Sequence, residues 1–513
     1  MLAATPLLLL YAQWRIWQLN ACKTSEMQEH ELLRLVRKAK STRFGRDHDF
    51  RNITGVRGFQ QRVPLRTYDD FWNDYWKLDF PRLKDCTWPG TNPYFALTSG
   101  TTTGVTKYIP CSREMLRANK RAAQDLLTYH LLSRPNSRIL GGKSFMLGGS
   151  TNLCEEAPGI YSGDLSGIEA NEIPRWAQPY CFPSRELALI ENWEEKIDQL
   201  ARLSLEEDIR ALSGTPSWLL VFFDKLSELR PDVDQHIANY YPELELLVHG
   251  GIGFKPYARR FSELLKGSRA EVREVYPASE GFIAIADRGQ DEGLRLMVDN
   301  GIFYEFVPLE ELGTSEPSRH WLANVEPGID YAVVLSTCAG AWGYVLGDTV
   351  RFIDLAPPRI LVTGRTSYVL SAFGEHLIAA EIEEAVATAA KAIDASIADY
   401  CVAPTFPATA GARGAHCYII EFIEQPVEAE RIAIFRKTLD DQLRILNADY
   451  DAHRTSDYGL RPPDLRVVPG GTFRAWMKRR DQLGGQHKVP RIINNTELFA
   501  ELQEFVSEKS ICV

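Results

Sequence analysis

The stretch Thr98 to Pro110, TSGTTTGVTKYIP, holds the densest set of residues that could do chemistry in this chain. Its two glycines let backbone N–H groups approach an anion, and its hydroxyl side chains could donate hydrogen bonds to phosphate oxygens. Lys107 adds a positive charge near the end of the stretch. The spacing is not that of a Walker A loop, in which the lysine directly follows the second glycine. A simple turn and a phosphate-binding loop both fit these residues.

Later stretches place polar residues where a nucleotide would need them. Residues 271–282 read as a strand that ends in a turn with Ser279 and Glu280, and a carboxylate there could hold Mg²⁺ against phosphates. Asp348 follows Gly347 in the run GYVLGDTVRF (343–352), and an aspartate can accept hydrogen bonds from ribose hydroxyls. Arg365, 17 residues further on, suits a contact to sugar or phosphate. Each feature alone is also common in turns and on surfaces.

Hydrophobic periodicity predicts the elements that must position these residues. Helical spacing of apolar residues predicts helices after the N-cap Ser112 and at 29–39, 218–229, 381–393 and 427–446. Short apolar runs predict strands at 244–249, 271–276, 303–307, 331–336, 360–362, 396–402 and 416–423. This alternation favours an α/β fold: a large N-terminal domain with several sheets, residues 1–365, and a smaller C-terminal α+β domain, residues 366–513.

Composition excludes several classes of protein. The chain of 513 residues has a formal charge of −10 that is spread along it, which argues against a nucleic-acid partner. Its nine cysteines form no C-x-x-C pair, so the sequence favours a reducing compartment over a zinc or disulfide framework. Gln13 and Arg15 interrupt the apolar start, which predicts an amphipathic first helix instead of a membrane span. We therefore expect a cytoplasmic protein with no membrane partner, and the oligomeric state is left open.

In their order and separation, these stretches resemble the adenylate-forming superfamily of acyl-CoA synthetases, luciferases and peptide-synthetase adenylation domains. The likeness is closer to the auxin-responsive acyl acid amido synthetases, because the first loop continues into Ile-Pro as theirs does. Three further runs resemble this family, particularly its bacterial members: LVHGGIGFKPYARRF (247–261), VVLSTCAGAWGYVLGDTVRF (333–352) and LGGQHKVPR (483–491). The resemblance extends from Leu32 to about Arg491.

The resemblance implies an enzyme that uses ATP and Mg²⁺ to adenylate a small carboxylic acid, releases pyrophosphate, and transfers the acyl group to an amino acid. It implies catalytic roles for Lys107, for Glu280 as the Mg²⁺ ligand, and for Lys488, which would bridge the acyl carboxylate and the α-phosphate from a mobile C-terminal domain. The residues implied to hold ATP are Ser99, Gly100, Thr101, Thr102, Lys107, Tyr276, Ser279, Tyr344, Asp348 and Arg365.

Some features keep other interpretations open. Gly343 stands where the family usually has arginine, and His376 lies near a lysine of the plant members, so a nucleotide-binding protein without turnover is one alternative. An acyl-CoA ligase is another, since the basic run 478–480 could meet the phosphates of CoA or simply end a helix. The acid is not identified by the sequence. The candidates for its pocket, which could equally be core residues, are Trp218, Phe222 and Tyr129.

Overall fold

A computed structural model of the chain contains two compact units. The first takes in most of the chain up to Leu361, and the second combines helix α13 (Ala258–Leu264) with the chain from Val362 onward. The structure describes residues 5–21, 23–98, 106–148, 152–190, 193–251, 254, 257–289, 292–366, 369–370, 377–405, 414–423, 427–447, 450–451, 454, 460–480, 482 and 488–507. The first unit ends at Leu361 and the second resumes at Val362, and both residues lie within strand β15 (Pro358–Arg365). The domain boundary between 365 and 366 therefore stays a prediction.

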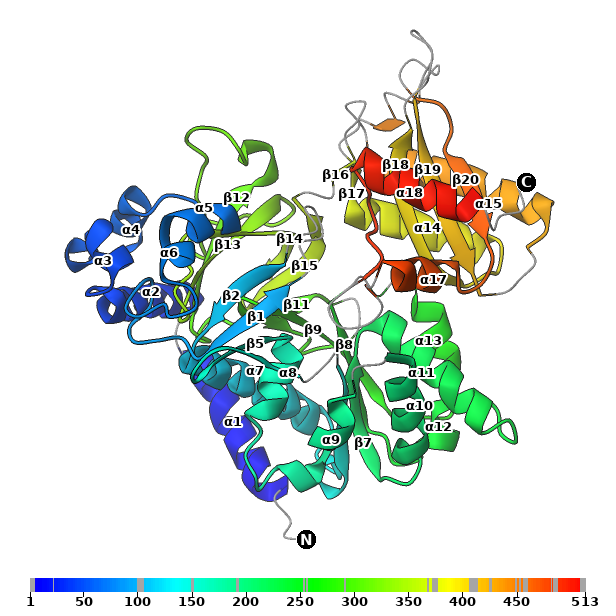
Figure 1. The fold of residues 1–513 in the computed structure, drawn as a ribbon, viewed down its shortest axis with the longest axis horizontal. Helices are drawn as coiled ribbons and strands as arrows, with labels where there is room; N and C mark the ends of the chain where they lie inside the picture. The colour runs from blue at the N-terminus through cyan, green and yellow to red at the C-terminus, as the bar shows by residue number, and fades with distance from the viewer. Residues whose placement is uncertain are drawn as a thin grey trace. The chain divides into compact units, whose positions relative to one another are not determined.

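Two sheets organise the described part of the first unit (Figure 1). The smaller has the order β2-β1-β5-β4, and the larger has the order β12-β13-β14-β15-β11-β10-β9-β8-β7-β3-β6. Neighbouring strands from β9 to β6 run parallel. The strand bounds are β1 (Tyr94–Thr98), β2 (Lys107–Cys111), β3 (Lys143–Leu147), β4 (Cys154–Ala157), β5 (Ile160–Gly163), β6 (Cys181–Phe182), β7 (Ile209–Gly214), β8 (Leu246–Gly250), β9 (Glu271–Ala278), β10 (Gly281–Ile285), β11 (Leu294–Leu296), β12 (Ile302–Pro308), β13 (Asp330–Thr337), β14 (Tyr344–Leu355) and β15 (Pro358–Arg365).

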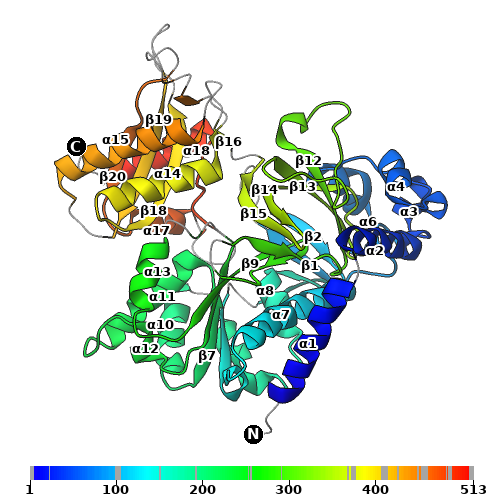
Figure 2. The same ribbon diagram turned by 180° about the vertical axis from the view of Figure 1, so that it is seen from behind.

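Helices cover both faces of the parallel strands, as expected where such strands are buried on both sides. Helices α1 and α7 lie side by side in Figures 1 and 2, and their apolar residues pack on one face. Helix α11 packs on the other face, where Phe222 meets Phe145 of β3. The helix bounds are α1 (Thr5–Ala21), α2 (Thr24–Ala39), α3 (Arg43–Asp47), α4 (Val56–Arg62), α5 (Tyr68–Phe71), α6 (Lys77–Asp79), α7 (Arg113–Ser133), α8 (Leu165–Asn171), α9 (Arg185–Ala188), α10 (Trp193–Ser204), α11 (Pro216–Leu229) and α12 (Ile237–Tyr240).

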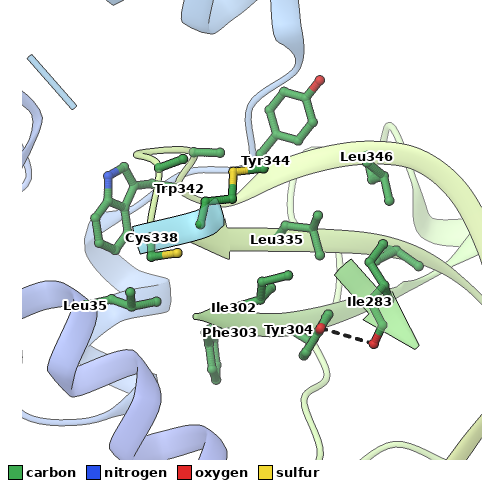
Figure 3. Packing of buried hydrophobic residues seen from close by; sticks show 14 of the residues in the cluster. Leu35, Ile283, Ile302, Phe303, Tyr304, Leu335, Cys338, Trp342, Tyr344 and Leu346 are labelled. Atoms are coloured by element: carbon green, nitrogen blue, oxygen red, sulfur yellow. Dashed lines mark hydrogen bonds between the residues drawn. The ribbon is translucent and has the colours of Figure 1, made fainter. Parts of the chain in front are cut away.

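The antiparallel strands of the large sheet form the main core of the first unit (Figure 3). Tyr304 of β12 is fully buried, and its hydroxyl donates to the carbonyl oxygen of Ile283 at 3.3 Å. Leu35 of α2 and Trp342 belong to the same cluster. Since a fully buried apolar side chain contributes about 1.5 to 3 kcal/mol, this cluster holds β12 to β14 firmly in place. Strand β14 carries the Gly347-Asp348 segment.

A polar network ties the end of α7 to the start of β9. Nδ1 of the fully buried His130 lies 2.7 Å from Oε2 of Glu271, and its Nε2 lies 3.2 Å from the hydroxyl of Ser137. The guanidinium of Arg273 also contacts Glu271. Burial opposes the charged form of Glu271, yet the hydrogen bonds from His130 and Arg273 outweigh it and lower the pKa of that carboxyl. The network thus favours an ionised Glu271 in the folded chain.

The second unit is built on the sheet order β18-β19-β20 in its described residues. Side chains of β18 and β19 are buried on both faces: Val402 and Ile420 pack on α14 and α15, and Cys401 and Ile419 pack on α17 and α18. Figures 1 and 2 show the two helix pairs on opposite sides of the sheet. The bounds are β16 (Val369–Leu370), β17 (Leu377–Ile378), α14 (Ala379–Ala392), β18 (Ile397–Thr405), β19 (Ala415–Phe422), α15 (Ala429–Leu446), β20 (Asp464–Val468), α17 (Thr472–Arg479) and α18 (Thr496–Ser507).

The mixed α/β architecture predicted from the sequence, with several sheets in a large N-terminal part and a further C-terminal domain, is confirmed. Ser112 caps α7, accepting a hydrogen bond from the backbone N–H of Met115 at 3.1 Å. The basic run at 478–480 ends α17, where Arg480 pairs with Glu501 and lies over the ring of Trp476. Within the described residues, no helix combines the length and the apolar character needed to cross a membrane.

Candidate functional site

The predicted phosphate loop connects β1 to β2. These strands pair antiparallel, and Thr98 stands opposite Lys107 at the end of the hairpin where the connecting loop begins. Nζ of Lys107 lies 5.2 Å from the ring centre of Tyr68, a cation–π distance. The connecting residues Ser99, Gly100, Thr101 and Thr102 lie outside the described residues. Lys107 is therefore placed at the mouth of the predicted loop, and the roles of the loop residues stay predictions.

A tight turn between β9 and β10 presents Ser279 and Glu280. Ala278 pairs with Gly281 across this turn. Gly281 has a φ of 151°, and a Cβ there would lie 2.7 Å from Cδ1 of Ile302, so the turn needs a glycine at this position. Glu280 is only 8% exposed and Ser279 is half-buried. The turn holds a carboxylate in a buried position directly after the strand that carries Tyr276.

Tyr276 and Asp348 come together although 72 residues separate them in the sequence. The hydroxyl of Tyr276 donates to Oδ2 of Asp348 at 2.6 Å. Tyr276 is buried in β9, and Asp348 is half-buried in β14 directly after Gly347. Hydrogen bonds to charged acceptors are short and strong, so the phenol fixes the direction of this carboxylate. Two separate sequence motifs thus meet at one carboxylate.

The neighbouring predicted residues occupy different surroundings. Tyr344 is 3% exposed and belongs to the main core, with its ring centre 6.1 Å from that of Phe71. Arg365 is half-buried at the end of β15 and belongs to the second unit. His376 lies outside the described residues. The structure gives Tyr344 an internal packing role, and its predicted contact with a nucleotide remains untested.

The three aromatic candidates for the acid pocket do not share one face of the sheet. Phe222 is fully buried on α11, with its ring centre 5.1 Å from that of Phe145, whereas the half-buried Trp218 lies one turn earlier. Tyr129 belongs to α7 and packs on the opposite face. Among the described residues no hydrogen-bond partner of its buried hydroxyl is found, and burial raises the pKa of Tyr129 to about 12. Trp218 and Tyr129 therefore cannot line the same wall.

His249 is a candidate that sequence reasoning missed. It lies at the carboxyl end of β8, opposite Gly214 of β7 and Glu274 of β9. Its side chain alternates with Val248, which packs toward α7, so the imidazole is on the face covered by α11. Burial lowers the pKa of His249 to about 4, so the ring is neutral near pH 7. The sequence did contain a signal for this site: a histidine followed by two glycines at the end of a predicted strand. Ligands often bind at the carboxyl ends of parallel strands, so this pattern could have marked His249 as a candidate.

Lys488 belongs to the second unit and is half-buried. It begins the described segment Lys488–Ser507 and precedes Val489, Pro490 and Arg491. Lys107, Tyr276, Ser279, Glu280 and Asp348 belong to the first unit. Within the described residues there is no group of three or more His, Cys, Asp and Glu side chains that could enclose a metal ion. A single buried carboxylate such as Glu280 suits Mg²⁺ when phosphate oxygens supply other ligands.

Family models match most of the chain. The GH3 family N-terminal domain matches residues 18–160 and 150–270, the GH3 family central domain matches residues 295–365, and the GH3 family C-terminal domain matches residues 380–497. The indole-3-acetic acid-amido synthetase GH3.4 of Arabidopsis thaliana is 22% identical to this chain, over 94% of this chain and 91% of its own length.

Solved structures with the same fold include two ligases. The GH3.15 acyl acid amido synthetase has a TM-score of 0.78 at 17% identity, over 95% of this chain and 94% of its own. A 2-hydroxyisobutyryl-CoA ligase in the postadenylation state has a TM-score of 0.62 at 13% identity, over 94% of this chain and 91% of its own. At such identities the likeness establishes the fold.

Proposed function

Since this chain belongs to the GH3 family, as the sequence resemblance indicated, we propose that it is an ATP-dependent acyl acid amido synthetase. The hydrogen bond between Tyr276 and Asp348 supports this proposal most directly. It joins two of the motifs that the resemblance implies hold ATP, and it leaves a carboxylate held in one direction. A preoriented carboxylate suits the recognition of a ribose hydroxyl pair.

The reaction has two steps. A carboxylate oxygen of the acid attacks the α-phosphorus of ATP, the bond to the β-phosphate oxygen breaks, and pyrophosphate leaves. The nitrogen of an amino acid then attacks the acyl carbon, the carbon–oxygen bond to AMP breaks, and the amine proton passes to solvent. Such displacements depend mainly on positioning and on neutralising the phosphates, so no side-chain nucleophile is required.

The residues of this chain divide that work. Lys107, at the mouth of the β1–β2 loop, binds the β- and γ-phosphates together with the loop residues, and Asp348 accepts from the ribose. Lys488 places its ammonium between the acyl carboxylate and the α-phosphate. Glu280 and the phosphate oxygens would hold Mg²⁺, which neutralises phosphate charge when bound. The acid enters at the carboxyl ends of β7 and β8, where Trp218 and the neutral His249 offer an aromatic wall and a hydrogen-bonding group.

A CoA ligase is the alternative with the same first step. The basic run that could meet CoA phosphates is engaged within its own unit, since Arg479 lies over Phe505 at 5.7 Å and Arg480 pairs with Glu501. This favours an amino acid as the acceptor. A protein that binds nucleotide without turnover, suggested by Gly343 and His376, is the third possibility.

One experiment separates these functions. Pyrophosphate and AMP are measured with ATP, Mg²⁺ and a panel of aryl, indolyl and aliphatic acids, with each of the twenty amino acids, with CoA, or with neither. We expect acid-dependent pyrophosphate, AMP that rises with an amino acid, and an amide by mass spectrometry. A thioester with CoA and no amide would contradict the proposal, and ATP binding without pyrophosphate from any acid would identify the inactive protein.

A further inference from the structure

Several side chains and a carbonyl oxygen hold the guanidinium of Arg491. Its Nη1 contacts the carboxylate of Asp399 and donates to the carbonyl oxygen of Tyr400 at 3.0 Å, and Nη2 contacts the hydroxyl of Tyr257. Its guanidinium carbon lies 4.4 Å from the ring centre of Tyr400, and its side chain is 11% exposed. All these residues belong to the second unit. The planar fork of an arginine satisfies these partners together, which the point charge of a lysine cannot do.

The backbone of Arg491 is fixed as well. Its carbonyl oxygen accepts from the N–H of Val402 at 2.8 Å, and the N–H of Ile493 donates to the carbonyl oxygen of Val402 at 2.8 Å. Residues 491–493 therefore run along the edge strand β18 in a short parallel pairing. Arg491 marks the point at which the chain becomes anchored to the sheet.

The residues between this anchor and Lys488 have little freedom. Pro490 has a fixed φ, and it restricts Val489 to an extended conformation. Val489 also packs against the core formed by β18, β19, α17 and α18. Three extended residues span at most about 10 Å, so the position of Arg491 limits where the backbone of Lys488 can lie.

We propose that Arg491 is a positioning residue for Lys488, which it holds at a fixed place for the adenylation step. This inference rests on the proposed function, in which Lys488 contacts the acyl carboxylate and the α-phosphate. Displacing a reacting group by about 1 Å can slow a reaction by about 100-fold, so an arginine that never touches the substrate can still control the rate.

The test compares Arg491→Lys with a matched control, Arg454→Lys. Arg454 is also nearly buried in the second unit, pairs with Asp440 at 2.6 Å and donates to the carbonyl oxygen of Leu460 at 3.0 Å. Both substitutions keep the charge and remove a guanidinium fork, so they share the cost to stability. If Arg491→Lys lowers the melting temperature into the assay range, Asp399→Asn takes its place, because it removes only the negative charge of one partner of Arg491.

The two half-reactions are then measured separately. We expect Arg491→Lys to lower kcat for acid-dependent pyrophosphate release by at least about tenfold, with KM for ATP and amide formation from supplied acyl-adenylate within about twofold. Arg454→Lys should change none of these. Combined with Lys488→Ala, Arg491→Lys should cause no further loss, because residues that act as one unit are not additive. Equal loss of both half-reactions, or a fully additive double variant, would overturn the positioning role.

A measurement without substrate separates this inference from the proposed function. Hydrogen exchange of the amides of Lys488, Val489 and residues 491–493 should become faster in Arg491→Lys than in wild type or Arg454→Lys. Wild-type protein that releases no pyrophosphate with any acid, but shows this local change, would refute the synthetase proposal and support the anchoring of the segment by Arg491. Unchanged exchange at 488–493 in a folded variant would refute the anchoring whatever the activity.

Discussion

Removing either partner of the hydrogen bond between Tyr276 and Asp348 tests the nucleotide site. Asp348→Ala removes the carboxylate that is predicted to accept from ribose. Hydrogen bonds to charged groups contribute about 1.5 to 3 kcal/mol, so the dissociation constant of ATP should rise roughly 10- to 150-fold. Tyr276→Phe keeps the carboxylate but removes the hydroxyl that donates to it from 2.6 Å away. Because the carboxylate is then less well oriented, ATP binding should weaken by only about 2- to 10-fold.

Titration calorimetry with ATP at fixed salt and Mg²⁺ measures these changes. Asp330→Ala is the matched control, because Asp330 pairs with Arg351 on the adjoining strands β13 and β14 without belonging to the predicted site. It should leave ATP affinity unchanged. If Tyr276 acts only by orienting Asp348, the double variant Tyr276→Phe with Asp348→Ala should bind ATP no more weakly than Asp348→Ala alone.

The outcome is decisive for the location of the site. An ATP dissociation constant that stays at the wild-type value in a folded Asp348→Ala protein would show that the ribose lies elsewhere. A larger loss in Tyr276→Phe than in Asp348→Ala would mean that the phenol itself contacts the nucleotide and that the carboxylate serves the phenol. The preferred acid should be the same in all these variants, because neither residue belongs to the predicted acid pocket.

Three more substitutions test other parts of the molecule. Lys107→Ala should lower acid-dependent pyrophosphate release by orders of magnitude at an unchanged melting temperature, because a loop-mouth lysine contributes little to stability; activity assays with thermal melts check this. Phe222→Ala should lower the free energy of unfolding, measured by urea titration, by about 3 to 5 kcal/mol. Trp218→Ala should mainly change which acids of the panel support pyrophosphate release. Because the pKa of Glu271 is lowered in the folded chain, its charge stabilises the fold above about pH 4.3. The stability deficit of Glu271→Gln in urea titrations should therefore be largest near pH 7 and shrink toward pH 3.

Local sequence patterns were enough to predict elements that are specified by a continuous apolar run or by a capping residue. The apolar run at 416–423 became β19 (Ala415–Phe422), and the N-cap Ser112 marked the start of α7 correctly. Both signals depend on near neighbours in the sequence, where propensity and capping act directly. Strand ends differed by a few residues, because pairing with other strands decides where a ladder stops.

Contacts between distant segments could not be predicted in this way. That Tyr129 and Phe222 lie on opposite faces follows from the order of β3, β7 and β8 in the sheet, which no single strand encodes. The contact of Arg491 with Asp399 spans 92 residues and needs β18 to be an edge strand. The sequence showed which residues carry charge, and the fold determined which of them meet.

Gly343 shows how a departure from the family pattern can belong to the fold. Its φ is +56°, and a Cβ there would lie 2.7 Å from the carbonyl oxygen of Pro64. Its N–H donates to the hydroxyl of Ser336 at 2.9 Å, and its carbonyl oxygen accepts from the N–H of Arg66 at 2.9 Å. An arginine at this position would be strained in the left-handed region and would require residues 63–66 to take another path. The glycine is therefore matched to its own surroundings, and the hydrogen bond between Tyr276 and Asp348 is formed in its presence. Loss of turnover does not follow from this substitution by itself.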